Sequence, residues 1–162
     1  MIDIRKITID DLVFLNEVRN LYSEDYLHDS RRFTIDETIN WYKKTNPDYY
    51  IILLNNIKIG YFRLSNYSVE NKNIYVGADI APEYKGLGLG KKSYNKFIPF
   101  LFNEYNLNKI SLEVLSTNHV AISLYEKIGF KTDGVKREEV YKKGKWIDSI
   151  IMSILKKEYE KF

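Results

Sequence analysis

Cysteine is absent from this sequence of 162 residues. Its absence excludes disulfide bonds, a thiol nucleophile and a cysteine-based metal site. Only two histidines, His28 and His119, are present, so we expect no metal centre. No apolar run approaches the length of a membrane span, and the first residues, MIDIRKITIDD, lack the apolar core of a signal peptide. We therefore expect a cytoplasmic protein that neither crosses nor binds a membrane.

The excess of one charge sign is also small, because the basic residues nearly balance the acidic ones and the net charge is only +3. Such a charge suits an anionic ligand, but the basic residues are spread along the chain and form no RNA-binding motif, so we expect no nucleic-acid partner. Hydrophobic residues make up 44% of the chain, which is enough for one core at this length. With no repeat and no linker, the sequence predicts a single domain over residues 1–162.

Alternating apolar residues, helical periodicity and turn signals predict a mixed α/β layer fold. The expected strands are IDIRKI, YYIILL, IKIGYFRLSNY, NIYVGADI, KISLEVL, VKREEVYKKG and KWIDSIIMSIL. The expected helices begin near Thr8–Asp11, at the Thr34/Glu37 capping box, near Gly88 and at HVAISLYEKIGF, which we expect to end in a left-handed cap at Gly129. The Asn55-Asn56 and Lys143-Gly144 pairs are typical of hairpin turns.

A glycine-rich turn, EYKGLGLGKKSYNKF, lies between an expected strand and an expected helix. It is not a Walker A loop, because Gly90-Lys91 is followed by Lys92. It is not a dinucleotide fingerprint either, because the glycines follow a GxGxG pattern and the residues near the position of the required acid are Tyr105, Asn106 and Leu107. Glycines at a helix start still allow close backbone approach to an anion. On these residues alone, an anion site and a turn with solvated lysines remain equally open.

Two segments together resemble the GNAT superfamily of acetyl-CoA-dependent N-acetyltransferases. IAPEYKGLGLG is similar to the family's pyrophosphate-binding motif, Q/R-x-x-G-x-G/A, at Lys85, Gly88 and Gly90. NHVAISLYEKIGF is similar to its second signature, Asn-x-x-Ala-x-x-Leu-Tyr-x-x-x-Gly-Phe. Lys85 departs from the usual Gln or Arg but keeps a cation at that position. The resemblance implies a mostly antiparallel central sheet flanked by about four helices.

The resemblance also implies that acetyl-CoA is the cosubstrate and that no metal takes part. Its pyrophosphate would lie on the glycine turn, and its pantetheine arm would pair with the strand end. A backbone N–H near Ile80 would polarise the acetyl carbonyl, although the Ile80 side chain can also simply pack in the core. The implied cofactor-binding residues are Ile80, Ala81, Lys85, Gly86, Leu87, Gly88, Leu89, Gly90, Lys91 and Asn118. Asn118 is alternatively a plain helix N-cap.

Two residues are implied to take part in proton transfer. Tyr125 occupies the position where many family members have a tyrosine near the cofactor sulfur, and a phenol with a pKa of about 10 can protonate a departing thiolate. The alternative, which we favour less, is that Tyr125 packs on Leu124 and Phe130 of an amphipathic helix. Glu113 occupies the position of a carboxylate base in some relatives, or is a solvated strand charge. Asp79 and Asp148 are further carboxylates on expected strands.

The acceptor pocket in this family is shaped by the first two helices, their loop and the last hairpin. We therefore expect substrate-binding residues among Arg19, Asn20, Glu24 and Trp41. The Arg19-Asn20 pair resembles the branch that acetylates amino sugars on nucleotide carriers, whereas the C-terminal segment resembles enzymes for ribosomal protein N-termini and polyamines. The sequence leaves the acceptor open.

We therefore expect an enzyme that transfers an acetyl group from acetyl-CoA to a primary amine by direct attack on the thioester. The amine belongs to a small molecule, such as a nucleotide-linked amino sugar or a polyamine, or to a protein N-terminus. A non-catalytic acyl-CoA-binding module is the alternative. A homodimer is compatible with the resemblance.

Overall fold

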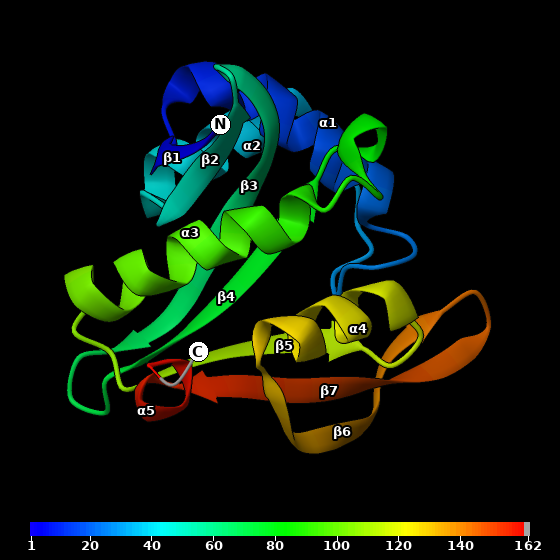
Figure 1. The fold of residues 1–162 in the computed structure, drawn as a ribbon. Coiled ribbons are helices and arrows are strands. Elements are labelled where there is room, and N and C mark those ends of the chain that lie inside the picture. The colour runs from blue at the N-terminus through cyan, green and yellow to red at the C-terminus, as the bar shows by residue number, and fades with distance from the viewer. Residues whose placement is uncertain (161–162) are drawn as a thin grey trace. The chain divides into compact units, whose positions relative to one another are not determined.

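The computed structural model describes residues 1–160 and has a mixed α/β fold (Figure 1). The strands are β1 (Ile2–Lys6), β2 (Tyr49–Leu54), β3 (Ile57–Ser68), β4 (Asn73–Ile80), β5 (Lys109–Leu115), β6 (Lys131–Lys142) and β7 (Lys145–Leu155). The helices are α1 (Leu12–Tyr22), α2 (Ile35–Thr45), α3 (Leu89–Glu104), α4 (His119–Ile128) and the short α5 (Lys156–Tyr159). Single 3-10 turns, η1 (Ile9–Asp11) and η2 (Pro82–Tyr84), precede α1 and α3.

The seven strands form one sheet in the order β1-β2-β3-β4-β5-β7-β6. The pairings β1–β2, β2–β3, β5–β7 and β6–β7 are antiparallel, and the pairing of β4 with β5 is parallel. This parallel pairing joins Asn73, Ile74 and Tyr75 to the first residues of β5, and β4 continues beyond it to Ile80. The predicted α/β class with a mostly antiparallel sheet is confirmed.

The chain divides into two compact units. Unit 1 comprises Met1–Leu64 and Ala78–Ser93, and unit 2 comprises Ser65–Gly77 and the chain from Tyr94 onward. Three elements, β3, β4 and α3, run from one unit into the other. None of the helices within residues 1–160 is long and apolar enough to cross a membrane.

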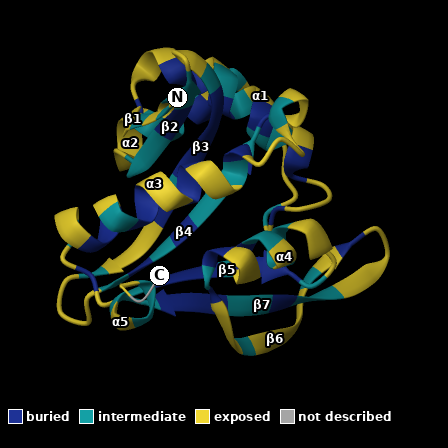
Figure 2. Ribbon diagram, in the orientation of Figure 1, coloured by how far each residue is buried: buried dark blue, intermediate teal, exposed yellow. Residues whose placement is uncertain are grey.

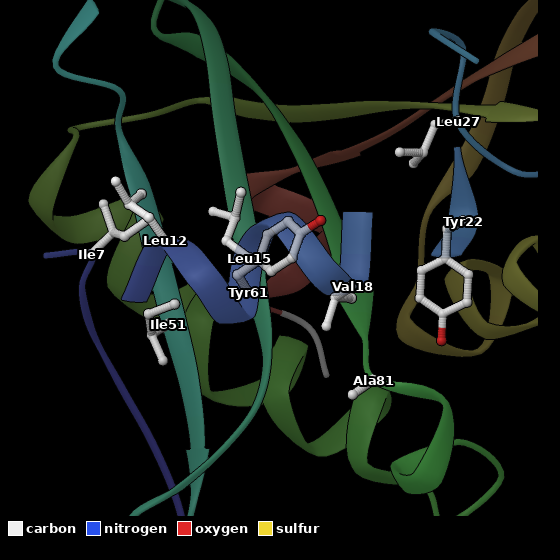
Figure 3. Close-up of a cluster of buried hydrophobic side chains, with 9 residues drawn as sticks. All are labelled: Ile7, Leu12, Leu15, Val18, Tyr22, Leu27, Ile51, Tyr61 and Ala81. Carbon is white, nitrogen blue, oxygen red and sulfur yellow. The ribbon is translucent and has the colours of Figure 1, made fainter. Parts of the chain in front are cut away.

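Unit 1 is built around an apolar cluster between α1 and the strands β2 and β3 (Figure 3). Residues Leu12, Leu15 and Val18 recur at helical spacing and are almost fully buried, so α1 presents one apolar face to Ile51 and Tyr61. The capping box at the start of α2 forms as predicted, because Glu37 N donates to Thr34 Oγ1 at 3.1 Å.

Unit 2 has its core on α3 and β5 and its most exposed strand at the sheet edge. Phe97, Ile98 and Leu101 of α3 are at most 1% exposed, as are Ile110 and Leu112 of β5. In contrast, β6 is exposed along most of its length, as edge strands commonly are (Figure 2). The Lys143-Gly144 turn joins β6 to β7 with positive φ at both residues, and the Asn55-Asn56 turn does the same between β2 and β3.

A buried carboxylate ties the start of α1 to two strands of unit 1. Asp11 is fully buried, and its carboxylate accepts hydrogen bonds from Arg5 of β1 at 2.7 and 2.9 Å. Lys58 Nζ of β3 lies 2.9 Å from Oδ1, and Thr8 N donates to Oδ2 at 2.8 Å. Burial alone would raise the pKa of Asp11, but hydrogen bonds from Arg5 and Lys58 outweigh it and place the pKa well below its ordinary value.

We expect Asp11→Asn to lower the free energy of unfolding by about 2–3 kcal/mol near neutral pH, because hydrogen bonds to charged groups are worth about 1.5–3 kcal/mol. A depressed folded-state pKa stabilises the fold above the ordinary Asp pKa of about 3.9, and this contribution is lost as the pH falls through the folded-state pKa. The difference in free energy of unfolding between parent and variant should therefore become smaller at acidic pH. Urea unfolding at neutral and acidic pH measures both effects.

Asp133→Asn is the matched control, because Asp133 is 40% exposed and pairs with Lys109 at 3.3 Å on the surface of unit 2. This variant should lose less than about 1 kcal/mol. Equal losses in the two variants would mean that the Asp11 cluster contributes no more than a surface ion pair.

Candidate functional site

The glycine turn of unit 1 adopts a backbone that requires glycine at two positions. After η2, Gly86 and Gly88 have φ angles of 75° and 73°, in the left-handed region. An added Cβ at either position would meet no heavy atom within 4 Å, so both residues face open space. The turn therefore presents bare backbone on its outer side, and the exposed side chain of Leu87 lies between the two glycines.

The first turn of α3 starts directly from this segment. Lys92 N donates to the carbonyl of Gly88 at 3.2 Å, which is the first hydrogen bond of the helix. The N–H groups of Leu89, Gly90 and Lys91 thus precede the helical ladder and have no acceptor within the helix. Together with the helix dipole and the exposed Lys91, they form the arrangement that binds phosphate at helix N-termini. The geometry fits the predicted pyrophosphate site, and the binding role itself stays a prediction.

Lys85 begins this turn and rests on two aromatic rings. Its Nζ lies 4.2 Å from the centre of the ring of Tyr22, the last residue of α1, and 5.1 Å from that of Tyr26, in the turn that follows α1. Burial lowers the pKa of Lys85, and the charge of Asp79 partly opposes this effect. Cation–π contact therefore holds the ammonium group beside the glycine turn.

The end of β4, where Ile80 and Ala81 lie, makes hydrogen bonds within unit 1. The carbonyl of Ile80 accepts from Tyr22 Oη at 2.5 Å, and Ala81 N donates to the carbonyl of Ile59 at 2.7 Å. These two backbone groups are occupied, so a pantetheine arm that pairs with β4 would have to use other backbone groups.

An ion pair with a buried carboxylate lies just before this strand end, and sequence reasoning named only that carboxylate. Asp79 is 9% exposed, and its Oδ2 lies 3.5 Å from Arg63 Nε of β3. Tyr61 of β3 is fully buried, and its pKa is raised well above the ordinary value by burial and then by the charge of Asp79. The signal in the sequence was an acid and a base next to apolar residues, in GADI and YFRL.

Arg19 and Asn20, which we expected to bind substrate, hold the segment between α1 and α2. Arg19 donates to the backbone carbonyls of Arg31 at 2.7 Å and Asp29 at 3.4 Å, and its guanidinium lies 4.5 Å from the centre of the Phe33 ring. Asn20 exchanges two hydrogen bonds with the backbone of Phe33, at 2.8 and 3.0 Å. Both side chains thus have a structural task, and substrate contact by either stays a prediction.

Glu24 and Trp41, the other two expected substrate residues, lie in different surroundings. Glu24 is exposed in the turn that follows α1. Trp41 of α2 is half-buried, with its ring centre 5.1 Å from that of Tyr49 on β2. The structure gives Trp41 a packing role against the apolar cluster of unit 1 and leaves Glu24 available to solvent.

In unit 2, α4 carries Asn118 and Tyr125. The side chain of Asn118 accepts a hydrogen bond from Ala121 N at 3.3 Å, so it caps the helix whatever else it contacts. Gly129 ends the helix with a φ of 119°, as predicted. Tyr125 is 9% exposed, and its ring packs edge-on against Tyr94 and Phe130, with centroid distances of 5.7 and 5.9 Å. The packing alternative for Tyr125 is therefore realised, and the acid role remains a prediction beside it.

Glu113 lies on β5 in unit 2, within reach of one side chain from the adjacent β7 and one from β6, the strand beyond it. Lys136 Nζ donates to Glu113 Oε1 at 2.7 Å, and Ser149 Oγ donates to Oε2 at 3.3 Å. The hydrogen bond with Glu113 raises the pKa of Lys136. Glu113 is thus an ion-paired carboxylate, and its role as a base stays a prediction.

Comparison with known proteins agrees with the two motifs. The model of the acetyltransferase (GNAT) family matches residues 15–130. An uncharacterized N-acetyltransferase p20 of Bacillus licheniformis is 32% identical over 90 residues, and this chain spans about half (51%) of its length. The spermidine N(1)-acetyltransferase of Vibrio cholerae is 32% identical over 146 residues, which cover 89% of this chain and 75% of that protein.

A solved structure of similar shape gives the same result for the fold. The crystal structure of spermidine N-acetyltransferase from Vibrio cholerae in complex with CoA and spermine aligns with a TM-score of 0.91 and 26% identity, over 98% of both chains. The expected family and the GNAT-like fold are confirmed by these matches.

We expect Gly88→Val to weaken acetyl-CoA binding at least about tenfold, or about 1.4 kcal/mol, because a branched side chain covers the backbone that would meet the pyrophosphate. Gly144→Val is the matched control. Gly144 also has a positive φ, 78°, and open space around an added Cβ, so both substitutions strain the backbone alike. Titration calorimetry of both folded variants measures the difference. Equal acetyl-CoA affinities in the Gly88→Val and Gly144→Val variants would contradict a pyrophosphate site at this turn.

Proposed function

Because the chain belongs to the acetyltransferase (GNAT) family, we propose that it transfers the acetyl group of acetyl-CoA to a primary amine of a polyamine. The observation that carries the choice of acceptor is the match to spermidine acetyltransferases across most of the chain. We also propose that both units act as one domain over residues 1–162, since the family match includes residues of each.

The charges of unit 1 favour a polyamine over a nucleotide-linked amino sugar. A nucleotide needs cations to hold its phosphates. Arg19 is directed to backbone carbonyls, and Arg31 forms a two-pronged pair with Asp29 whose closest contact is 2.7 Å. Arg19 and Arg31, two of the cations that the sequence offers for a nucleotide, are thus used within the loop. The exposed carboxylate of Glu24 suits the second ammonium group of a polyamine.

The proposed donor site uses the glycine turn from Lys85 to Lys91 for the pyrophosphate, with Ile80 and Ala81 beside the acyl end and Asn118 as a further cofactor contact. The amine nitrogen attacks the thioester carbon, forms the N–C bond and expels the thiolate as the C–S bond breaks. We assign the proton that the thiolate gains to Tyr125 and the proton that the amine loses to Glu113, directly or through water. A backbone N–H near Ile80 polarises the carbonyl.

A thiol-release assay with a panel of amines tests the proposed function. We expect acetyl-CoA to release free thiol fastest with spermidine or spermine, and more slowly with a nucleotide-linked amino sugar, amino acids or a basic peptide. Fully N-acetylated spermidine is the control acceptor, because it keeps the chain but has no primary amine. Faster release with the nucleotide-linked sugar would replace the proposed acceptor. Release with none of the amines would leave a non-catalytic acyl-CoA-binding module.

The pH profile of turnover separates the proposed acid from the proposed base. Tyr125→Phe should lower kcat by about 10²–10⁴ with acetyl-CoA affinity nearly kept, as expected for a lost general acid. Glu113→Gln should be slow at neutral pH and should recover partly at high pH, where the amine is already neutral.

Tyr67→Phe provides the control for these profiles, since Tyr67 is 45% exposed and its hydroxyl donates to the backbone carbonyl of Tyr105. It should match the parent at every pH. A Tyr125→Phe variant with full turnover, or a Glu113→Gln profile that superimposes on the parent, would remove that residue from the mechanism, provided that chemistry limits the rate.

A further inference from the structure

The peptide group between Ile80 and Ala81 is held at both of its polar ends. A peptide group is planar, so its C=O and N–H turn together. Tyr22 Oη donates to the C=O at 2.5 Å, and the N–H donates to the carbonyl of Ile59 at 2.7 Å. Figure 3 shows the Tyr22 hydroxyl directed toward the segment that carries Ala81. Rotation of this plane would break both hydrogen bonds, so its orientation is fixed.

The preceding peptide group, which contains the N–H of Ile80, is fixed by close packing on β3. A Cβ added at Gly60 would lie 2.4 Å from the Asp79 carbonyl oxygen and 3.1 Å from Ile80 Cα. Only glycine allows this approach of two strands. The two peptide planes on either side of Ile80 are thus set, one by Tyr22 and Ile59 and the other by Gly60.

Tyr22 also contacts the glycine turn through its ring. The ring lies 4.2 Å from Lys85 Nζ, and Tyr22 is only 7% exposed. Burial, followed by the charges of Asp79 and Glu83, raises the pKa of Tyr22 to about 12. Its hydroxyl therefore stays protonated and remains a hydrogen-bond donor throughout the neutral range. One side chain of α1 thus contacts both the end of β4 and the cation that begins the glycine turn.

We propose that Tyr22 is a positioning residue that fixes the end of β4 for the acetyl carbonyl and seats Lys85 beside the cofactor's phosphates. The inference rests on the proposed function, because the acetyl group must lie against this strand end. The two tasks belong to different parts of the side chain. The hydroxyl acts on the acyl end, and the ring acts on the phosphate end.

Tyr22→Phe separates the two tasks, because it removes the hydroxyl and keeps the ring. We expect kcat to fall by about tenfold to a hundredfold, since small misplacement of reacting groups is costly, while KM for acetyl-CoA changes by less than about twofold. Tyr22→Leu removes the ring as well and should add a loss of acetyl-CoA affinity. A purely structural role would instead lower the amount of folded enzyme and leave the kcat of each folded molecule unchanged.

Tyr67→Phe is the matched control. The Tyr67 hydroxyl donates to the backbone carbonyl of Tyr105 at 3.0 Å in unit 2, so the same kind of hydrogen bond is lost away from the glycine turn. This variant should keep both kcat and KM. An unchanged kcat in Tyr22→Phe, or an equal fall in Tyr67→Phe, would overturn the proposal.

Calorimetry with acetyl-CoA and with CoA gives a readout that does not need turnover. The parent should bind acetyl-CoA more tightly than CoA, because the fixed strand end meets the acetyl carbonyl, and Tyr22→Phe should reduce this preference. If the parent shows the preference but acetylates no amine, the proposed function fails while the calorimetric comparison still decides the role of Tyr22. The same preference in parent and variant would reject that role.

Discussion

The left-handed backbone at Gly86 and Gly88 is the constraint on which the proposed chemistry depends. These two residues turn the chain out of η2 and into α3, and Gly88 supplies the first carbonyl of the helical ladder. The turn therefore decides where α3 begins and which N–H groups remain outside its ladder. A residue with a Cβ at either position would strain the backbone even though nothing stands nearby. Backbone geometry, more than the lysine charges, makes this segment suitable for a phosphate.

Local signals in the sequence predicted most of the fold because short-range chemistry determines them. The Asn55-Asn56 and Lys143-Gly144 turns, the Thr34/Glu37 box and the Gly129 cap each depend on residues within one turn of chain. The short α5 was not predicted, because four residues show no helical periodicity. At its start, Leu155 N donates to Glu158 Oε1 and Lys156 N donates to the carbonyl of Asn108, which is distant in the sequence. The register shifts in the pairing of β6 with β7 were not predicted either, because they correspond to no sequence pattern that we used.

Partners far apart in the sequence account for what could not be predicted about the site. Tyr22 and Ile80 are 58 positions apart, and no periodicity links them. Glu113 could be placed on a strand, but its pairing with Lys136 depends on how β5, β7 and β6 align. Arg19 and Asn20 were expected to bind substrate, yet their side chains donate hydrogen bonds to backbone carbonyls of the loop that precedes α2. In each case the residue type was evident and its partner was not.

This difference explains why the donor could be inferred from the sequence more readily than the acceptor. Backbone N–H groups would bind the donor's phosphates, and the glycines that leave those groups exposed form a recognisable sequence motif. The acceptor would be met by side chains, whose availability depends on competing ion pairs. Asp29 is held by Arg31, and Asp79 lies beside Arg63. A carboxylate that already faces an arginine attracts an ammonium group less than an unpaired one does, because the two charges largely cancel at a distance. Under the proposed function, the choice of acceptor would therefore depend on which acids of unit 1 remain unneutralised once the loop and the strands have formed their own pairs.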